Sequence, residues 1–456
     1  MRGVVFTGGR ELELMDFPDP TPGPDEVVIE MKASGMCGSD LHQYRRPKAG
    51  GDTGGLAAPS APTIAGHEPC GIVAAVGSAV SPAQAKIGQR VMIHHYKGCT
   101  VCGHCRSGWA QLCQEVPVTV YGNNGHGGHA AYMKAPAFTV VPLPDALSFT
   151  TGAAISCGTG TAYGALRRIR LSGNDTIAIF GQGPVGLSAT QLAHAMGARV
   201  IALDVSEERL ARAKDFGAAE TVNPRSNDPV GAIKDLTHGY GAEFTLDTSS
   251  QPEGRIAAVR ATKVWGTTCF VGERNQVTID VSPDMLRKQL TIVASWTFSS
   301  IGQAECARFV ADRGIDVEAL FTSVVADMGP PNLVVYNPSY RTRGPVAELD
   351  PQEVLKTITV TCFGGFLVAQ QAARLMLKEG HGTILFTGAS ASIKGYARSA
   401  SFAMGKFGLR GLAQSMAREL GPKNIHVAHF VIDGGIRRGD DPRANERGPD
   451  GLLEPD

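Results

Sequence analysis

The sequence predicts an α/β protein in which a β-rich N-terminal domain precedes a parallel sheet. Short apolar runs such as VVIEMKA, GIVAAVG and RVMIHHY alternate with Gly and Pro turns up to about residue 150, as in a partly open β-barrel. From about residue 170 to 300, apolar strands alternate with helical stretches, which is typical of βαβ units. A second, shorter α/β stretch follows after about residue 330.

Length and composition limit the possible functions. The 456 residues are enough for about three domains. The chain has 43 Lys plus Arg and 43 Asp plus Glu residues. It therefore lacks the net positive charge that would indicate a nucleic acid or an anionic membrane as partner. We find neither a signal-peptide pattern nor a run of about 18 apolar residues. We therefore expect a cytoplasmic protein with a small-molecule partner.

The run CTVCGHCRSGWAQLC contains the most specific motif. Cys99, Cys102, Cys105 and Cys113 form a CxxCxxCx7C pattern. Four thiolates so close in sequence can complete one tetrahedral shell, and zinc prefers four sulfurs in that geometry. The alternative is a set of free or disulfide-paired cysteines, but cysteines two residues apart rarely meet disulfide geometry. The motif therefore predicts a structural zinc site.

A glycine motif in IAIFGQGPVG predicts a dinucleotide site. Gly181, Gly183 and Gly186 follow a predicted strand and open a predicted helix, where backbone amides can approach a pyrophosphate. Asp204 at the end of the next strand can accept hydrogen bonds from ribose hydroxyls and would repel a 2'-phosphate, which favours NAD over NADP. Arg209 is close enough in sequence to reach the adenine ribose. The alternative is an ordinary turn with a solvated acid.

Three other segments contain residue types that bind metals. They are GMCGSDLH with Cys37, AGHEPCG with His67, and AISCGTGTAYG with Cys157. A catalytic zinc needs about three protein ligands and an open position, which these residues can supply. Each residue alone is more often an ordinary packed side chain, so the pattern by itself leaves this second site open.

Residues 1 to about 325 resemble the zinc-dependent alcohol dehydrogenases of the medium-chain dehydrogenase/reductase superfamily. Four motifs match in order: CGSDLH, GHE, the four-cysteine run, and GxGxxG with its acid. The resemblance implies a GroES-like β-barrel catalytic domain and a Rossmann NAD-binding domain. It also implies that Cys37, His67 and Cys157 are ligands of a catalytic zinc, so that the chain holds two zinc ions.

The same resemblance implies the reaction and further residue roles. Glu68 would lie near the metal, Ser39 and His42 would carry the alcohol proton to solvent, and Thr161 would lie beside the nicotinamide. The implied activity is NAD-dependent hydride transfer from a primary or secondary alcohol, or the reverse reduction of a carbonyl compound. Polyol and threonine dehydrogenases often have a glutamate near the place of Cys157, so this cysteine favours the simple-alcohol type. A polyol or amino-alcohol dehydrogenase is the alternative.

From about residue 332 to 436 the chain resembles the second half of a short-chain dehydrogenase/reductase. VVYNPS, ITVTCFGGFLVAQ, ILFTGASAS and SFAMGKFGLRGLAQSMARELG follow in that family's order, whereas its N-terminal TGxxxGxG half is absent. The family's active-site tyrosine falls on Phe402, its serine on Ala389 and its asparagine on Thr361, and Lys406 remains. Without a phenolic hydroxyl, this segment is expected to have no oxidoreductase chemistry of its own.

The predicted organisation has four parts. They are a zinc-binding catalytic domain (1–158), a Rossmann domain with the start of a return to the catalytic domain (159–325), a partial short-chain dehydrogenase segment (326–436) and a mobile tail (437–456). A linker is expected at Gly329, Pro330 and Pro331.

The third part is either an assembly module, consistent with a homo-oligomer, or a fused fragment. Its segment ARLMLKEGHGTILFTG is a candidate to replace the missing last helix and strand of the first family. If this C-terminal part abolishes catalysis, the alternative function is that of an NAD-binding or scaffold protein.

Overall fold

The structure, a computed structural model, describes residues 1–48, 61–317, 333–337, 339–432, 435–436 and 452–453. The chain divides into two compact units, Met1–Val324 and Val325–Asp456. This division lies next to the boundary expected between residues 325 and 326. The linker expected at residues 329–331 lies outside the described residues.

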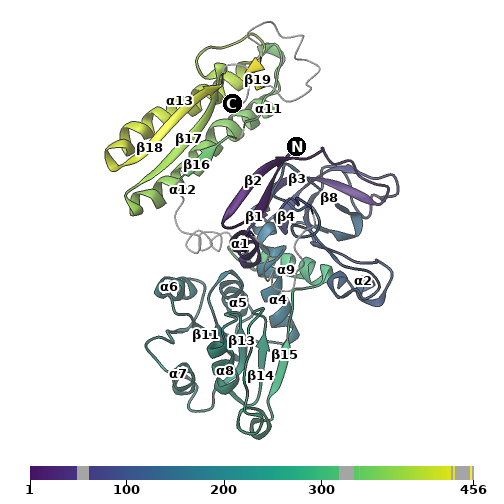
Figure 1. The fold of residues 1–456 in the computed structure, drawn as a ribbon, viewed down its shortest axis with the longest axis vertical. Helices are drawn as coiled ribbons and strands as arrows, with labels where there is room; N and C mark the ends of the chain where they lie inside the picture. Colours follow the sequence, from purple (N-terminus) through teal and green to yellow (C-terminus); the bar gives the residue numbers. More distant parts are fainter. Residues whose placement is uncertain (49–60, 318–332, 338, 433–434, 437–451, 454–456) are drawn as a thin grey trace. The chain divides into compact units, whose positions relative to one another are not determined.

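An antiparallel sheet with the strand order β8-β3-β4-β5-β9 builds the first domain of unit 1 (Figure 1). Its strands span, in that order, Tyr132–Pro136, Glu26–Gly35, Glu68–Val76, Arg90–Ile93 and Val140–Pro142. A hairpin of β1 (Arg2–Gly8) and β2 (Glu11–Asp16) precedes the sheet. Val27, Ile29 and Ile93 are fully buried in one apolar core, which explains the short β-branched runs of the sequence.

Short elements attach to this sheet and connect it to the next domain. Helix α1 follows β3 directly, and a small lobe of two strands and two helical turns follows β5. Two consecutive helices, α3 and α4, then lead into the second domain. These elements are α1 (Gly38–Arg45), β6 (Tyr96–Lys97), α2 (Gly103–Arg106), η1 (Ala110–Leu112), β7 (Thr119–Val120), η2 (Ala137–Thr139), α3 (Phe149–Ile155) and α4 (Gly158–Arg168).

Within the described residues, six parallel strands form the sheet of the second domain. Their spatial order β12-β11-β10-β13-β14-β15 corresponds to 3-2-1-4-5-6 in chain order, the arrangement of dinucleotide-binding folds. The strands span, in spatial order, Glu220–Val222, Arg199–Leu203, Thr176–Phe180, Ala242–Asp247, Thr262–Phe270 and Thr291–Ala294. The predicted parallel sheet is therefore confirmed.

Helices cover both faces of this sheet, which is why its central strand β10 has apolar residues on both faces. In β10, Ile177 and Ile179 belong to one core while Ala178 and Phe180 belong to another. The first core includes Leu187 of α5, and the second includes residues of α8. The helices are α5 (Pro184–Ala195), α6 (Glu207–Asp215), α7 (Pro229–Leu236) and α8 (Pro252–Ala261).

After β14 the chain passes through two short helical turns, η3 (Val281–Met285) and η4 (Leu286–Lys288), and then through β15. Helix α9 (Ser300–Arg313) returns to the first domain, where it packs against α3, α4 and β9. Its Cys306 is fully buried in the same core as residues of α4. The predicted return to the catalytic domain thus begins with α9, and the segment VEALFTSVV that follows lies almost entirely outside the described residues.

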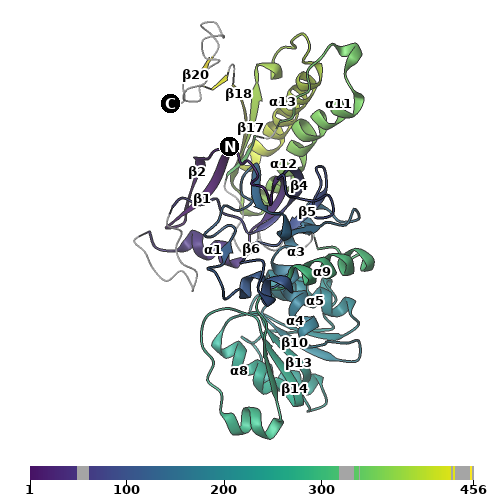
Figure 2. The ribbon, with the colours of Figure 1, turned by 90° about the vertical axis from the view of Figure 1, so that its right-hand side faces the viewer.

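Unit 2 contains a parallel sheet in the order β16-β17-β18, with helices α11 to α13 on one of its faces (Figure 2). Its main elements are β16 (Leu333–Tyr336), η5 (Val346–Glu348), α11 (Pro351–Ile358), η6 (Thr359–Phe363), α12 (Gly364–Glu379), β17 (Gly382–Ala389), η7 (Ser390–Ser392), α13 (Ala400–Leu420), η8 (Gly421–Lys423) and β18 (Ile425–Ile432). Helix α11 begins at Pro351, where Asp350 caps it by accepting the amide of Gln352.

The segment ARLMLKEGHGTILFTG stays within unit 2. Its strand β17 pairs with β16 along one edge and with β18 along the other. Both hydrogen-bonding edges are therefore used, and this strand does not replace a missing strand of unit 1. Of the predicted tail 437–456, the structure describes only β20 (Leu452–Leu453), which pairs with β19 (Gly435–Ile436).

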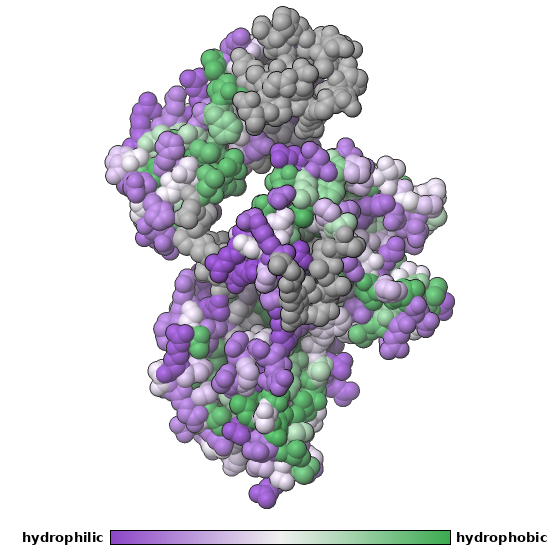
Figure 3. Space-filling view, in the orientation of Figure 1, coloured by the Kyte–Doolittle hydropathy of each residue, from purple (hydrophilic) through white to green (hydrophobic). Residues whose placement is uncertain are grey.

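One helical stretch of the described chain, Pro351–Glu379, is long and apolar enough by length and composition to cross a membrane. Core helices pass the same test, and this stretch contributes Ala369, Ala372 and Met376 to the apolar core of unit 2. Other apolar side chains remain exposed on it, and apolar residues are visible on this unit in the space-filling view (Figure 3).

We predict that Phe386→Ala destabilises unit 2 by about 3 to 5 kcal/mol. The Phe386 side chain, on β17, is fully buried in the apolar core of this unit, and its removal leaves a cavity. Urea denaturation followed by circular dichroism measures this change. Phe363→Ala is the control, since that ring is 52% exposed and its loss should change the free energy of unfolding by less than about 0.5 kcal/mol. Equal effects of the two substitutions would contradict the described core.

Candidate functional site

The structure brings Cys37, His67 and Cys157 together from three separate elements. Cys37 caps the N-terminus of α1, His67 immediately precedes β4, and Cys157 caps the N-terminus of α4. Cys37 Sγ lies 3.0 Å from His67 Nε2 and 4.0 Å from Cys157 Sγ. A carboxylate oxygen of Glu68 belongs to the same group, in which all donor atoms lie within 4.8 Å of one another.

The distance between the two sulfurs fits a metal ion. In a tetrahedral zinc site with Zn–S bonds of about 2.3 Å, two sulfurs are about 3.8 Å apart. The separation of 4.0 Å between Cys37 Sγ and Cys157 Sγ is close to that value. Two thiolates and an imidazole also form a ligand set that zinc accepts while keeping one position open. The donor set thus fits the zinc that the family resemblance implied here.

Asp40 is a site residue that the sequence interpretation missed. Its carboxylate is fully buried, accepts a hydrogen bond from His67 Nδ1 at 3.0 Å and accepts another from the amide of Cys37 at 3.0 Å. Burial alone would lower the pKa of His67, but the charges of Asp40 and Cys37 hold that pKa well above its ordinary value. With Nδ1 protonated toward Asp40, His67 presents Nε2 to the metal position. The sequence signal that could have identified Asp40 is the acidic residue inside the motif CGSDLH.

The remaining predicted residues of this site lie in different places. Burial, followed by the charge of Cys37, raises the pKa of Glu68 well above its ordinary value. Ser39 Oγ lies 2.9 Å from Cys37 Sγ and 3.3 Å from His67 Nε2. His42 is bonded through its ring nitrogens to Arg274 and not to Ser39. The structure therefore brings Ser39 into the cluster, whereas His42 lines the same cavity but contacts Arg274.

The four cysteines of the lobe also converge. Cys99 Sγ lies 3.9 Å from Cys105 Sγ, and Cys102 Sγ lies 4.0 Å from Cys113 Sγ, again close to the edge of about 3.8 Å expected for a ZnS4 tetrahedron. Backbone amides point at the sulfurs, and the amide of Cys99 lowers the pKa of Cys113 to about 6. The four sulfurs thus fit a closed structural zinc site.

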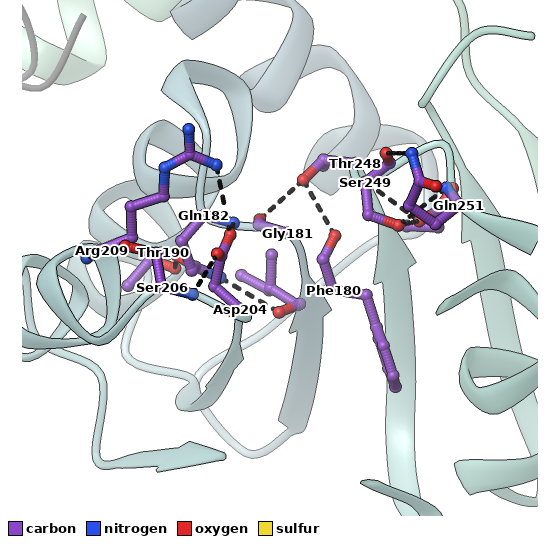
Figure 4. Close-up of polar contacts among 12 residues, drawn as sticks. Phe180, Gly181, Gln182, Thr190, Asp204, Ser206, Arg209, Thr248, Ser249 and Gln251 are labelled. Carbon is purple, nitrogen blue, oxygen red and sulfur yellow. Dashed lines mark hydrogen bonds and ion pairs between the residues drawn. The ribbon is translucent and has the colours of Figure 1, made fainter. Parts of the chain in front are cut away.

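The predicted dinucleotide turn has the geometry that its glycines suggest. Gly181 follows β10 with a φ of +89°, and a Cβ on Gly186 would lie 1.8 Å from the carbonyl oxygen of Gly181. Thr248, at the end of β13, donates to the carbonyls of Phe180 and Gly181 and holds the turn (Figure 4). The N-terminus of α5 therefore opens directly at this turn.

Asp204 lies directly after β11 and beside the turn (Figure 4). Its carboxylate accepts the amides of Gln182 at 2.6 Å and Ser206 at 2.9 Å, and Arg209 Nη1 is 3.7 Å away. The carboxylate is 5% exposed, so the protein fixes its orientation before a ribose arrives. The glycines, the acid and Arg209 are thus brought together as predicted from the sequence.

A cavity of about 510 Å³ joins the two domains of unit 1. Cys37, His67 and Cys157 line it from the first domain, while Thr248 and Arg274 line it from the second. Thr161, whose amide donates to the carbonyl of Cys157 at 2.8 Å, also lines the cavity. Aromatic lining residues that the sequence interpretation did not single out are His95, Tyr96 and Trp296.

In unit 2 the altered short-chain positions are packed as structural residues. Lys406 is buried and donates from Nζ to the carbonyl of Thr387 at 2.8 Å. The ring of Phe402 lies under the Arg341 guanidinium, 4.8 Å from its centroid. Thr361 is fully buried and accepts the amide of Tyr340. Phe402 itself carries no hydroxyl that could act as the phenol.

Comparison with known families agrees with this architecture. The alcohol dehydrogenase GroES-like domain matches residues 23–145, and the zinc-binding dehydrogenase family matches residues 184–312. The short chain dehydrogenase family matches residues 298–436. This last match begins at Phe298, two residues before α9, and so includes a helix that packs within unit 1.

Individual proteins show the same likeness over unit 1. The uncharacterized zinc-type alcohol dehydrogenase-like protein YphC of Escherichia coli (strain K12) is 39% identical over 319 residues, which are 68% of this chain and 88% of that protein. Sorbitol dehydrogenase of Bacillus subtilis (strain 168) is 31% identical over 331 residues, or 71% of this chain and 89% of that protein. The structure of the alcohol dehydrogenase TADH from Thermus sp. ATN1 matches with a TM-score of 0.64 and 26% identity, covering 72% of this chain and 97% of that chain.

The chain therefore belongs to the zinc-type alcohol dehydrogenases, a family of oxidoreductases. A partial short-chain dehydrogenase follows in the same chain.

We predict that Asp40→Asn weakens metal binding at Cys37, His67 and Cys157 by about 10- to 100-fold, because partners that orient a metal-binding histidine typically contribute that much. Competition of the zinc-loaded protein with a chromophoric chelator measures the affinity. Asp145→Asn is the matched control, since that carboxylate is fully exposed. An unchanged affinity in the Asp40 variant would show that His67 does not depend on this hydrogen bond.

Proposed function

We propose that the chain is an NAD-dependent zinc alcohol dehydrogenase that transfers hydride between an alcohol and NAD. One observation carries this proposal: the group Cys37, His67 and Cys157 faces the same cavity as the cofactor-side residue Thr248. A metal at this group and a nicotinamide entering from the Rossmann domain would meet in that cavity. Zinc would act as the Lewis acid on the alcohol oxygen, and NAD would accept the hydride.

The side chains of the cavity have roles that follow from their positions. Cys37, His67 and Cys157 would hold the zinc, and Asp40 would fix the orientation of His67. Ser39 Oγ is close enough to the ligand group to take the proton of a bound alcohol. His42 would complete the path to solvent once a bound cofactor displaces Arg274 from its ring. The four-cysteine lobe would hold the second zinc and take no part in the chemistry.

The cofactor preference rests on Asp204. Its carboxylate is fixed by two backbone amides at the place where a ribose would lie, so it can accept the ribose hydroxyls and would repel a 2'-phosphate. Gly181, Gly183 and Gly186 would carry the pyrophosphate at the start of α5. Thr161 would contact the nicotinamide end, since it lines the cavity next to Cys157.

A simple primary or secondary alcohol is the substrate class that the cavity favours. Tyr96 and Trp296 add aromatic surface that suits an apolar substituent, although polar side chains such as Asn123 also line the cavity. A polyol is the second candidate, because sorbitol dehydrogenase is among the relatives. We also infer a cytoplasmic location and no role for nucleic acids or membranes.

Activity and metal dependence can be measured together. The full chain, incubated with NAD and a panel of primary and secondary alcohols, sorbitol and threonine, should produce NADH with simple alcohols most efficiently. Dialysis against a strong chelator should abolish this activity, and added zinc should restore it, because the alcohol has no other activating group. Activity that survives removal of all zinc would contradict the mechanism, and cofactor binding without any turnover would instead indicate a scaffold.

We predict that Asp204→Ser shifts the ratio of kcat/KM for NAD to kcat/KM for NADP toward NADP by at least about tenfold. The substitution removes a negative charge that would face the 2'-phosphate and leaves Arg209 nearby, and like charges brought together cost several kcal/mol. Steady-state kinetics with both cofactors measure the ratio. Asp215→Ser, at a largely exposed position, should leave it unchanged. If both variants keep the wild-type ratio, Asp204 does not select the cofactor.

A further inference from the structure

The buried ion pair of Asp247 and Arg255 belongs to neither proposed metal site. Asp247, the last residue of β13, is fully buried, and Arg255 in α8 is 7% exposed. Arg255 Nε lies 3.1 Å from Asp247 Oδ2, while Asp247 Oδ1 accepts the amide and the hydroxyl of Ser249. Burying two charges costs solvation energy, which their attraction repays only when further hydrogen bonds satisfy the remaining donors.

The remaining donors of Arg255 bind the loop 272–275, which follows β14. Nη1 donates to the carbonyl of Asn275 at 3.0 Å, and Nη2 donates to the carbonyl of Gly272. The planar guanidinium thus joins the first and the last residue of this loop while its Nε stays on Asp247. A lysine carries a point charge in place of this fork and cannot bond all three partners in the same way.

The loop needs such support, because its backbone is strained and cavities lie along it. Arg274 and Asn275 have φ angles of +66° and +58°, in a region that few residues other than glycine adopt. Val271, Glu273 and Asn275 line both the cavity of about 510 Å³ and a second cavity of about 310 Å³. Packing alone therefore holds the loop weakly, and strained backbone persists only where its surroundings fix it.

Glu273 connects this loop to a row of aromatic rings that line the larger cavity. The row begins at His67, a proposed zinc ligand, whose ring centroid lies 5.2 Å from that of His95. The ring of Tyr96 follows at 4.2 Å, and the ring of Trp296 lies 6.1 Å beyond it. The indole Nε1 of Trp296 donates to Glu273 Oε1. The position of the last ring in the row therefore depends on the loop.

We propose that Arg255, anchored on Asp247, is a positioning residue that holds the loop 272–275. Through Glu273 the loop fixes Trp296, and with it the aromatic wall along which the substituent of an alcohol would lie. This proposal rests on the proposed function, since it presumes that an alcohol binds at the metal group. It adds a distinction among substrates: an alcohol with an aromatic substituent depends on the wall, whereas ethanol is too short to use it.

The first test is Arg255→Lys, which keeps a positive charge beside Asp247 but removes the fork that spans the loop. The ratio of kcat/KM for benzyl alcohol to kcat/KM for ethanol is measured with NAD on the zinc-loaded full chain. This ratio does not depend on the fraction of active protein, so a loss of stability alone leaves it unchanged. We expect it to fall about tenfold, a usual size for the loss of apolar contacts in a pocket.

Arg260→Lys is the matched control. Arg260 lies on the same helix and is likewise bonded to an acid, Asp284, but it lines neither cavity. The same substitution at this position should keep the wild-type ratio.

A second variant, Glu273→Met, removes the acceptor of the Trp296 indole at an exposed position, where folding does not depend on the side chain. It should lower the same ratio. The double variant with Arg255→Lys should lower the ratio no further than the single variants do, because both substitutions act on one ring. Additive effects would show that Arg255 does not act through Glu273.

Fluorescence reports on the wall without catalysis. The chain contains three tryptophans, so replacing Trp109 and Trp265 by phenylalanine leaves Trp296 as the single emitter. In this background Arg255→Lys should make the Trp296 emission more easily quenched by acrylamide, and Arg260→Lys should not.

The outcomes separate this proposal from the proposed function. A wild-type ratio or wild-type quenching in Arg255→Lys would overturn the positioning role, as would equal changes in Arg255→Lys and Arg260→Lys. If Arg255→Lys does not fold, a wild-type ratio in Glu273→Met would overturn the role of the wall. A wild-type chain that oxidises neither alcohol would contradict the proposed function, and the quenching would then decide alone whether Arg255 holds Trp296.

Discussion

The meeting of Cys37, His67 and Cys157 is the constraint on which the rest of unit 1 depends. Three segments distant in sequence must reach one point, so β3 must end, and β4 and α4 must begin, beside the same cavity. Two thiols, an imidazole and a carboxylate within 4.8 Å form a group that a cation stabilises far better than protons do. The antiparallel sheet holds two of these residues, and the helix that leads into the Rossmann domain holds the third.

The two cysteine groups of unit 1 serve different purposes in this account. The four sulfurs of Cys99 to Cys113 lie within 4.8 Å of one another, so a zinc bound by all four would keep no open position and would only stabilise structure. The lobe is nevertheless linked to the rest of unit 1, because Gln111 in the lobe donates a hydrogen bond to the carbonyl of Phe298, just before α9. Unit 2 has its own core around Phe386, and its buried Lys406 is bonded to a backbone carbonyl rather than poised for proton transfer.

Motifs with fixed spacing made most of the fold and the ligand groups predictable from the sequence. The four cysteines, the glycines from Gly181 to Gly186 and Asp204 were found because their chemistry demands that spacing. Asp40 was missed, because a single acidic residue forms no sequence pattern and its role depends on its neighbour in space. The contact of His42 with Arg274 was also unpredictable, since it joins residues 232 positions apart. The roles of the ligand residues stay predictions until a metal is located.

The central claim is that unit 1 holds a second, catalytic zinc in addition to that of the lobe. Anomalous X-ray diffraction from a crystal of the full chain, recorded on both sides of the zinc absorption edge, locates each metal ion directly. The account predicts two peaks, one among the four cysteines and one between Cys37, His67 and Cys157. A single peak in the lobe, with none at Cys157 in zinc-saturated protein, would contradict it.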